Sequence, residues 1–187
     1  NNLQSRWNAL VNSIERGVAE NPADRQPVRL FVDGPKLSDA YIYDPLFDNV
    51  DDCPSLRDPT CGGRYIHGTI IFTASENSAH PASLTRFITE SLAAYPQADQ
   101  VVVVLVGHGA GWSANALPGQ PSGWREQSDA SGGFLWDDHP GTSVSGSQSL
   151  STAALHQALA DANRSSQRGI DLLYLDGCSM GMVEVAY

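Results

Sequence analysis

The spacing of hydrophobic and polar positions predicts alternating helices and strands along this chain. Apolar residues recur three and four positions apart, as on one face of an amphipathic helix, in residues 3–20, 80–97 and 149–164. Short apolar runs bounded by Gly, Pro or Asp predict strands within residues 27–34, 38–44, 64–74, 99–107 and 169–177. Strands and helices that alternate in this way favour a parallel sheet with helices on both faces.

The most apolar predicted strand is the run at residues 101–106, in which every residue is Val or Leu. Such a run, without alternation, is typical of a central strand that is buried on both faces. Two other regions lack regular spacing. Residues 45–63 are rich in Asp, Pro, Gly and Cys and are interpreted as a surface excursion, whereas residues 109–149 are interpreted as one long loop, a feature that is often functional.

Length and charge narrow the classes of protein that fit. With 187 residues, 41% of them hydrophobic, the chain is long enough for one core, so we expect a single domain over residues 1–187. A formal net charge of −10 would repel phosphates and disfavours nucleic acid as a partner. No stretch approaches the ~18 apolar residues of a membrane span. Because the chain begins at Asn1 without a visible signal peptide, we expect a processed product or a fragment truncated at both ends.

The three cysteines leave two arrangements open. Cys53 and Cys61 lie in one loop, where they either form a small disulfide or stay reduced. A disulfide would indicate an oxidising compartment. The third cysteine, Cys178, is left over in either case.

Two predicted strands end in Gly-containing tips that carry reactive side chains. One tip places His108 between two glycines, and the other places Cys178 after Asp176 and Gly177. Because ligands of parallel sheets bind beyond the carboxyl ends of the strands, these tips form the candidate site.

The second tip offers two nucleophiles, of which Ser179 is the first. Residues 177–181 match the G-x-S-x-G pattern that places a nucleophilic serine on a strand-to-helix turn in α/β-hydrolases. That family has its acid and His after the serine, whereas the few residues that follow Ser179 contain no His. A serine hydrolase therefore requires partners from a longer parent chain.

The other nucleophile is Cys178, with His108 as its partner. A neighbouring His favours the thiolate, which is the reactive form of cysteine. The order of His before Cys, about 70 residues apart, suits a caspase-like arrangement. The backbone amides of Gly109 and Cys178 would form an oxyanion hole.

Two sequence blocks surround these tips. The first is an apolar strand followed by His-Gly-x-Gly-Trp at residues 108–112, and the second is an apolar strand followed by Asp-x-Cys-x-Met and Glu-x-x-Tyr at residues 176–187. Together they resemble the signature blocks of the clostripain-like cysteine peptidases, of the caspase–gingipain–legumain group. Gly177 replaces a usual Ala and Ser179 a usual bulky residue. The resemblance implies a caspase-like three-layer α/β/α sandwich with a mostly parallel central sheet.

The resemblance also implies roles for single residues. Cys178 would attack the scissile carbonyl, and His108 would protonate the leaving amine. Asp176 would line the S1 pocket and pair with Arg or Lys at P1 of a peptide substrate. A carboxylate in such a pocket selects basic side chains through charge-assisted hydrogen bonds. The chain would then be a cysteine endopeptidase with no cofactor required for its chemistry.

Processing, calcium and export are further implications of the resemblance. Family members are often cut between the two blocks, and of Arg125, Arg164 and Arg168 we favour Arg125, because it lies in the long loop. Some relatives need calcium. The candidate calcium ligands in this sequence are two acidic clusters, Asp48, Asp51 and Asp52, and Asp137 and Asp138. The family also implies a secreted or cell-envelope protein.

Two alternatives compete with catalysis. Asp176 could cap the helix that follows it, where a carboxylate also meets the helix dipole. The whole chain could be a non-catalytic module of the same fold that binds a peptide or partner.

Overall fold

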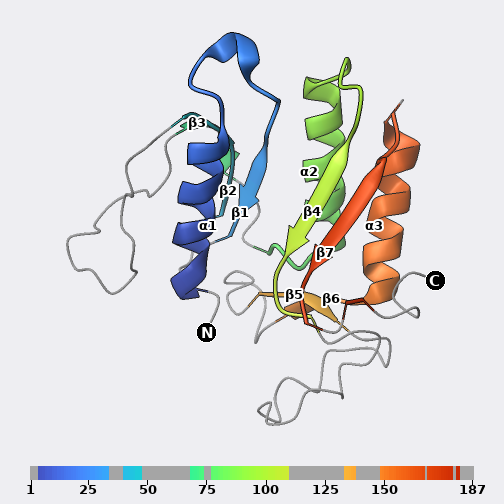
Figure 1. Ribbon diagram of the computed structural model, residues 1–187. Coiled ribbons are helices and arrows are strands. Elements are labelled where there is room, and N and C mark those ends of the chain that lie inside the picture. The colour runs from blue at the N-terminus through green and yellow to red at the C-terminus, as the bar shows by residue number, and fades with distance from the viewer. Residues whose placement is uncertain are drawn as a thin grey trace. The chain divides into compact units, whose positions relative to one another are not determined.

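The protein is described by a computed structural model (Figure 1). The structure describes residues 4–33, 40–47, 68–73, 77–109, 133–137, 148–166, 168–178 and 180–181. Contacts divide the chain into two compact units, one within residues 1–74 and the other mainly within residues 75–187. Each unit is considered by itself.

The first unit contains one long helix and an antiparallel sheet. Helix α1 (Gln4–Gly17) and the short 3-10 helix η1 (Pro22–Asp24) precede three strands, β1 (Leu30–Val32), β2 (Tyr41–Pro45) and β3 (Gly68–Thr73). The sheet order is β1-β2-β3, and both pairs are antiparallel. The expected mostly parallel sheet is wrong for this unit. The connection from β1 to β2 is shorter than the crossover of a dozen or more residues that parallel strands need.

The core of the first unit surrounds Tyr43, whose side chain is fully buried. Val11, Val18 and Ile42 are also buried there, together with the acidic Glu15. Burial raises the pKa of the Tyr43 phenol above its usual range, and the Glu15 carboxylate raises it further. Ionised Tyr43 is therefore disfavoured in the folded state.

The second unit is built on a parallel pair of strands. Strand β4 (Val102–Val106) pairs with β7 (Leu172–Asp176), from Val102 opposite Leu172 to Val106 opposite Asp176. Helices α2 (Pro81–Ala94) and α3 (Thr152–Ser165) pack against each other and lie on one face of this pair (Figure 1). Two short strands, β5 (Phe134–Asp137) and β6 (Gln148–Leu150), form an antiparallel pair near the carboxyl ends of β4 and β7 (Figure 1).

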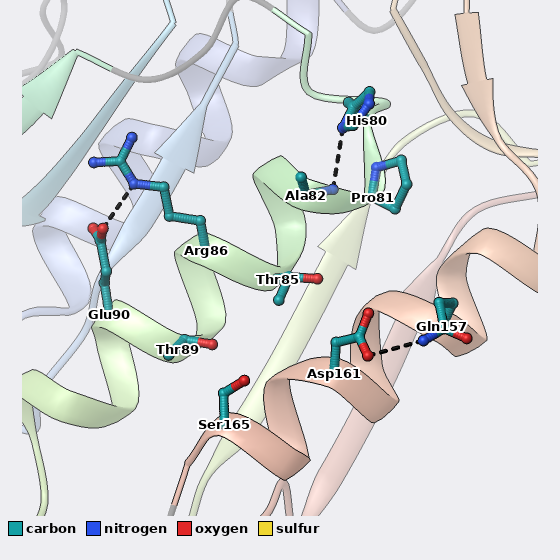
Figure 2. Close-up of a pocket in the computed structure, with 10 residues that line it drawn as sticks. All are labelled: His80, Pro81, Ala82, Thr85, Arg86, Thr89, Glu90, Gln157, Asp161 and Ser165. Carbon is teal, nitrogen blue, oxygen red and sulfur yellow. Dashed lines mark hydrogen bonds and ion pairs between the residues drawn. The ribbon is translucent and has the colours of Figure 1, made fainter.

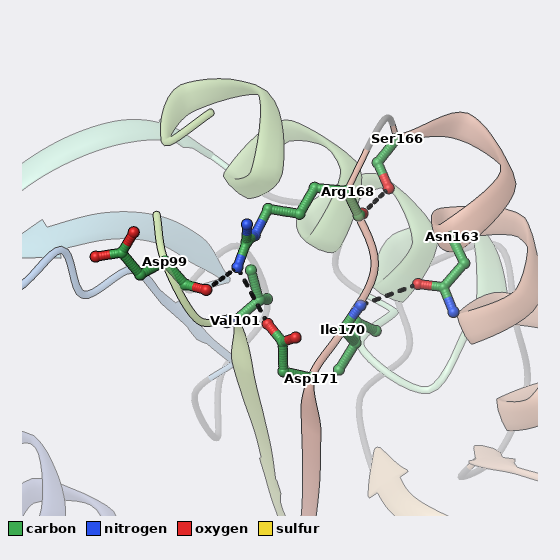
Figure 3. A network of polar contacts seen from close by, with 7 residues as sticks. All are labelled: Asp99, Val101, Asn163, Ser166, Arg168, Ile170 and Asp171. Carbon is green, nitrogen blue, oxygen red and sulfur yellow. Dashed lines mark hydrogen bonds and ion pairs between the residues drawn. The ribbon is translucent and has the colours of Figure 1, made fainter. Parts of the chain in front are cut away.

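Polar contacts secure the amino-terminal ends of β4 and β7 (Figure 3). The Asp171 carboxylate accepts the backbone N–H of Val101 at 2.7 Å and lies 3.3 Å from the Arg168 guanidinium. Arg168 also donates to the backbone carbonyl of Asp99. The Asn163 side chain, at the end of α3, accepts the backbone N–H of Ile170 at 3.3 Å. These contacts join the segment before β4 to the segment before β7, which helps to fix the strand register.

The core of the second unit lies between the strand pair and the two helices. Its buried members are Leu84, Ile88, Leu92, Val103, Leu105, Phe134, Leu150, Leu155, Ala158, Ala162 and Met180. The opposite face of the pair is exposed and carries Val102, Val104, Val106, Leu172 and Tyr174. The prediction that residues 101–106 are buried on both faces is therefore wrong in the described structure, because α2 and α3 cover the same face.

The predicted helices and strands are confirmed. All three predicted helices form, and each of the five predicted strands overlaps an observed strand. The predicted surface excursion at residues 45–63 lies mostly outside the described residues. Helix α2 begins after His80, whose ring nitrogen accepts the N–H of Ala82 at 3.2 Å, and α3 begins after Ser151, which caps it in the same way. None of the described helices is long and apolar enough to cross a membrane.

The one-sided burial of β4 predicts unequal effects of neighbouring substitutions. Val103→Ala should lower the free energy of unfolding by about 2 kcal/mol, because Val103 is 8% exposed and its truncation leaves a cavity. Val104→Ala, at 52% exposure, should cost no more than about 0.5 kcal/mol. Urea unfolding measures both. Equal losses would show that the second face is also buried in solution.

The buried phenol of Tyr43 predicts a loss of stability at alkaline pH. Because the pKa of Tyr43 is raised on folding, its contribution is present below the unfolded value of about 10 and is lost as the pH rises above that value. Tyr43→Phe should make the free energy of unfolding less dependent on pH between about 9 and 11. Tyr174→Phe, which changes an exposed phenol, is the matched control. The same pH dependence in both variants would contradict the assignment.

Candidate active site

The two predicted tips leave the sheet side by side. Val106 and Asp176 are register partners, and the backbone N–H of Gly107 donates to the Asp176 carbonyl at 3.1 Å, which extends the ladder beyond β4. The segments that carry His108 and Cys178 therefore start from the same edge of the parallel pair. This adjacency of strands is the one that the sequence predicts.

The backbones of the two tips touch at Gly109. A Cβ atom added to Gly109 would lie 2.5 Å from the carbonyl oxygen of Cys178 and 2.7 Å from Cγ of Met180. Both distances are too short for a side chain, so the close approach requires glycine at this position. The structure thus brings Gly109, one of the expected oxyanion donors, into contact with the main chain of Cys178.

The reactive groups of the second tip are accessible. Cys178 is exposed and carries a free thiol. Asp176, the last residue of β7, is also exposed, and its carboxylate forms no ion pair with the residues that the structure describes. An accessible carboxylate two residues before an accessible thiol can form an ion pair with a cationic group of a bound molecule. The thiol can then react with a neighbouring group of the same molecule.

His108 is half-buried, and its backbone is held by a segment that the sequence did not single out. The carbonyl of His108 accepts the backbone N–H of Leu135 at 3.0 Å, and Gly109 forms an antiparallel bridge with Phe134. The interpretation of residues 109–149 as one long loop is wrong here, since β5 lies within this range and β6 begins in it. The apolar run Phe134-Leu135-Trp136 is a signal for β5, but it is too short to predict a strand by itself.

Several predicted residues lie outside the described part of the chain. They are Arg125, Ser179, both cysteines of the predicted loop pair (Cys53 and Cys61), and the acidic residues Asp48, Asp51, Asp52 and Asp138. The remaining acid of the calcium prediction, Asp137, is buried, and its carboxylate accepts the backbone N–H of Ser78 at 3.2 Å. Within the described ranges, no group of three or more His, Cys, Asp or Glu side chains could hold a metal ion.

A separate groove of about 550 Å³ lies between α2 and α3 (Figure 2). It is lined by His80, Pro81, Ala82, Thr85, Arg86, Thr89, Glu90, Gln157, Asp161 and Ser165. Hydrogen bonds from Gln157 and Arg164 lower the pKa of the Asp161 carboxyl, and Arg86 pairs with Glu90 at 2.7 Å. The groove contains neither strand tip, and its charged groups already have partners. It is not the candidate active site.

Comparison with known proteins identifies a family for most of the chain. The profile of the clostripain family matches residues 62–187, about two thirds of the chain, and the match contains both tips. No curated protein and no solved structure matches the chain. With a profile match of this extent, the chain belongs to the clostripain family, a family of cysteine peptidases.

Proposed function

We propose that the protein is a cysteine endopeptidase that cleaves peptide bonds after Arg or Lys, with Cys178 as nucleophile and His108 as its partner. The observation that carries the proposal is the contact between the two tips at Gly109. It places an exposed free thiol at the same sheet edge as the only His that lies on a strand tip in the described residues. The clostripain profile supports the same chemistry.

The proposed reaction has two steps. The Cys178 thiolate attacks the scissile carbonyl carbon, and the resulting oxyanion is stabilised by the backbone amides of Gly109 and Cys178. His108 donates a proton to the amine as the C–N bond breaks, which leaves a thioester on Cys178. His108 then accepts a proton from water, which attacks the thioester and releases the acid product and the Cys178 thiolate, so that the thiolate and protonated His108 are restored.

Asp176 is proposed to select the P1 side chain. Its carboxylate lies at the end of β7, two residues before Cys178, and is exposed. A guanidinium or ammonium group at P1 would gain a charge-assisted hydrogen bond there. The alternative role of Asp176, as a cap of the following helix, concerns residues that lie mostly outside the described part of the chain.

Self-cleavage is proposed at Arg125 rather than at the other two arginines of the interblock region. Arg164 belongs to α3 and pairs with Asp161, and the Arg168 side chain is held by Asp99 and Asp171. A protease binds its substrate in an extended form, so cleavage at either position would require local unfolding. Arg125 lies outside the described residues, in the Gly- and Ser-rich stretch.

Removing the thiol tests the nucleophile. Cys178→Ala should lower kcat/KM for peptides with Arg at P1 by on the order of 10⁴-fold or more, because no other group forms the thioester. Initial rates with a fluorogenic Arg-P1 peptide measure the loss, and the folding of the variant is checked by circular dichroism. Retained activity in a folded Cys178→Ala protein would exclude Cys178 and reopen Ser179 as nucleophile.

Removing the charge of Asp176 tests the pocket. Asp176→Asn keeps the shape of the side chain, so kcat/KM for Arg-P1 peptides should fall on the order of 10²-fold while that for neutral P1 residues changes little. The ratio of the two values is the measurement. An unchanged preference for Arg would place the specificity pocket elsewhere, even if Cys178 remains essential.

A further inference from the structure

Strand β5 contacts both tips of the candidate site, although it belongs to neither sequence block. Its residue Phe134 bridges to Gly109, and the backbone N–H of Leu135 donates to the carbonyl of His108 at 3.0 Å. Both contacts lie on the carboxyl side of the His108 α-carbon. One short strand therefore holds the main chain where it leaves His108.

The Phe134 side chain reaches the other tip. A Cβ atom added to Gly177, the residue before Cys178, would overlap the edge of the Phe134 ring, with Cδ2 at 3.2 Å, and would lie 2.9 Å from the Gly107 carbonyl oxygen. Phe134 is 1% exposed and belongs to the core that includes Val103 and Leu105. The ring thus occupies the space that a side chain at position 177 would need.

The Leu135 side chain makes the equivalent contact at the first tip. A Cβ atom added to Gly107 would lie 2.8 Å from Cδ2 of Leu135. Leu135 itself has φ of 55°, in the left-handed region that a residue with a side chain rarely adopts. Such a conformation is unfavourable and persists only where neighbouring contacts impose it. Here it is accompanied by the amide bond to His108 and by the contact with Gly107.

We propose that Phe134 and Leu135 are positioning residues for the His108–Cys178 pair. The proposal rests on the proposed peptidase function. Phe134 sets how closely the Gly177 turn approaches the core, and so places the Cys178 backbone. Leu135 holds the carbonyl of His108. Because the two residues are adjacent in one strand, they fix the separation between acid and nucleophile.

The space shared by Phe134 and Gly177 gives a test by rescue. Gly177→Ala should lower kcat for an Arg-P1 peptide at least tenfold with little change in KM, because the added methyl displaces the turn and Cys178 with it. Phe134→Leu should lower kcat several-fold. In the double variant Phe134→Leu/Gly177→Ala, the shorter side chain removes the overlap of the methyl with the ring, although the contact with the Gly107 carbonyl oxygen stays, so the rescue is partial. Its kcat should exceed the product of the two single effects at least fivefold.

A stability control separates positioning from simple loss of packing. Leu155→Ala removes a buried side chain of α3 in the same core and should lower the thermal midpoint, while kcat stays within twofold of the parent protein. Independent, multiplicative effects of Phe134→Leu and Gly177→Ala would overturn the proposal. So would a loss of kcat in Leu155→Ala equal to that in Gly177→Ala.

The same single and double variants can also be compared by a measurement that does not depend on peptide hydrolysis. This measurement distinguishes failure of the positioning proposal from failure of the proposed function. The rate at which iodoacetamide alkylates Cys178, mapped by mass spectrometry, reports the surroundings of an exposed thiol in any folded variant. Rescue of this rate in the double variant, in a protein that hydrolyses no peptide, would retain positioning and reject the peptidase. If the two substitutions had independent, multiplicative effects on both the alkylation rate and kcat, the positioning proposal would be rejected and the proposed peptidase function would stand. If Gly177→Ala does not fold, recovery of folding in the double variant would count as the rescue. If the double variant does not fold either, the positioning proposal is overturned.

Discussion

The structure of the second unit depends on the parallel register of β4 and β7. Polar contacts join the two segments of the chain where these strands begin. They are made by the side chains of Asp171 and Arg168 with the backbone of Val101 and Asp99. Equal strand lengths then bring the two carboxyl ends to the same edge. At that edge the Gly109 backbone approaches Cys178 so closely that only glycine fits. A slip in register would separate the His tip from the Cys tip.

Packing beneath the tips links the site to the core. Met180 and Phe134 are buried with residues of α2 and α3, and both also contact a glycine of a tip. The two tips therefore pack against the same side chains that form the core. The thiol of Cys178 nevertheless remains exposed. A well-packed segment under an accessible thiol is the arrangement that the proposed peptidase would require to orient its substrate.

Much of this arrangement could be predicted from the sequence, because helical and strand periodicity identify the elements and Gly-flanked tips indicate a site at the strand ends. Three features could not. The unpartnered face of β4 depends on which side the helices pack, and a run of valines fits either outcome. β5 is short and lies in a stretch without periodicity. The left-handed conformation of Leu135 follows from tertiary contacts, since leucine has no intrinsic preference for it.

The proposed roles of Cys178 and Asp176 are tested together most directly by covalent labelling of the intact protein with an acyloxymethyl ketone that carries Arg at P1, followed by mapping of the adduct. We expect one thioether on Cys178 and no labelling by the same warhead with an acidic P1 residue. A folded protein that forms no adduct on Cys178, or that forms it equally with the acidic probe, would contradict the joint assignment of nucleophile and pocket.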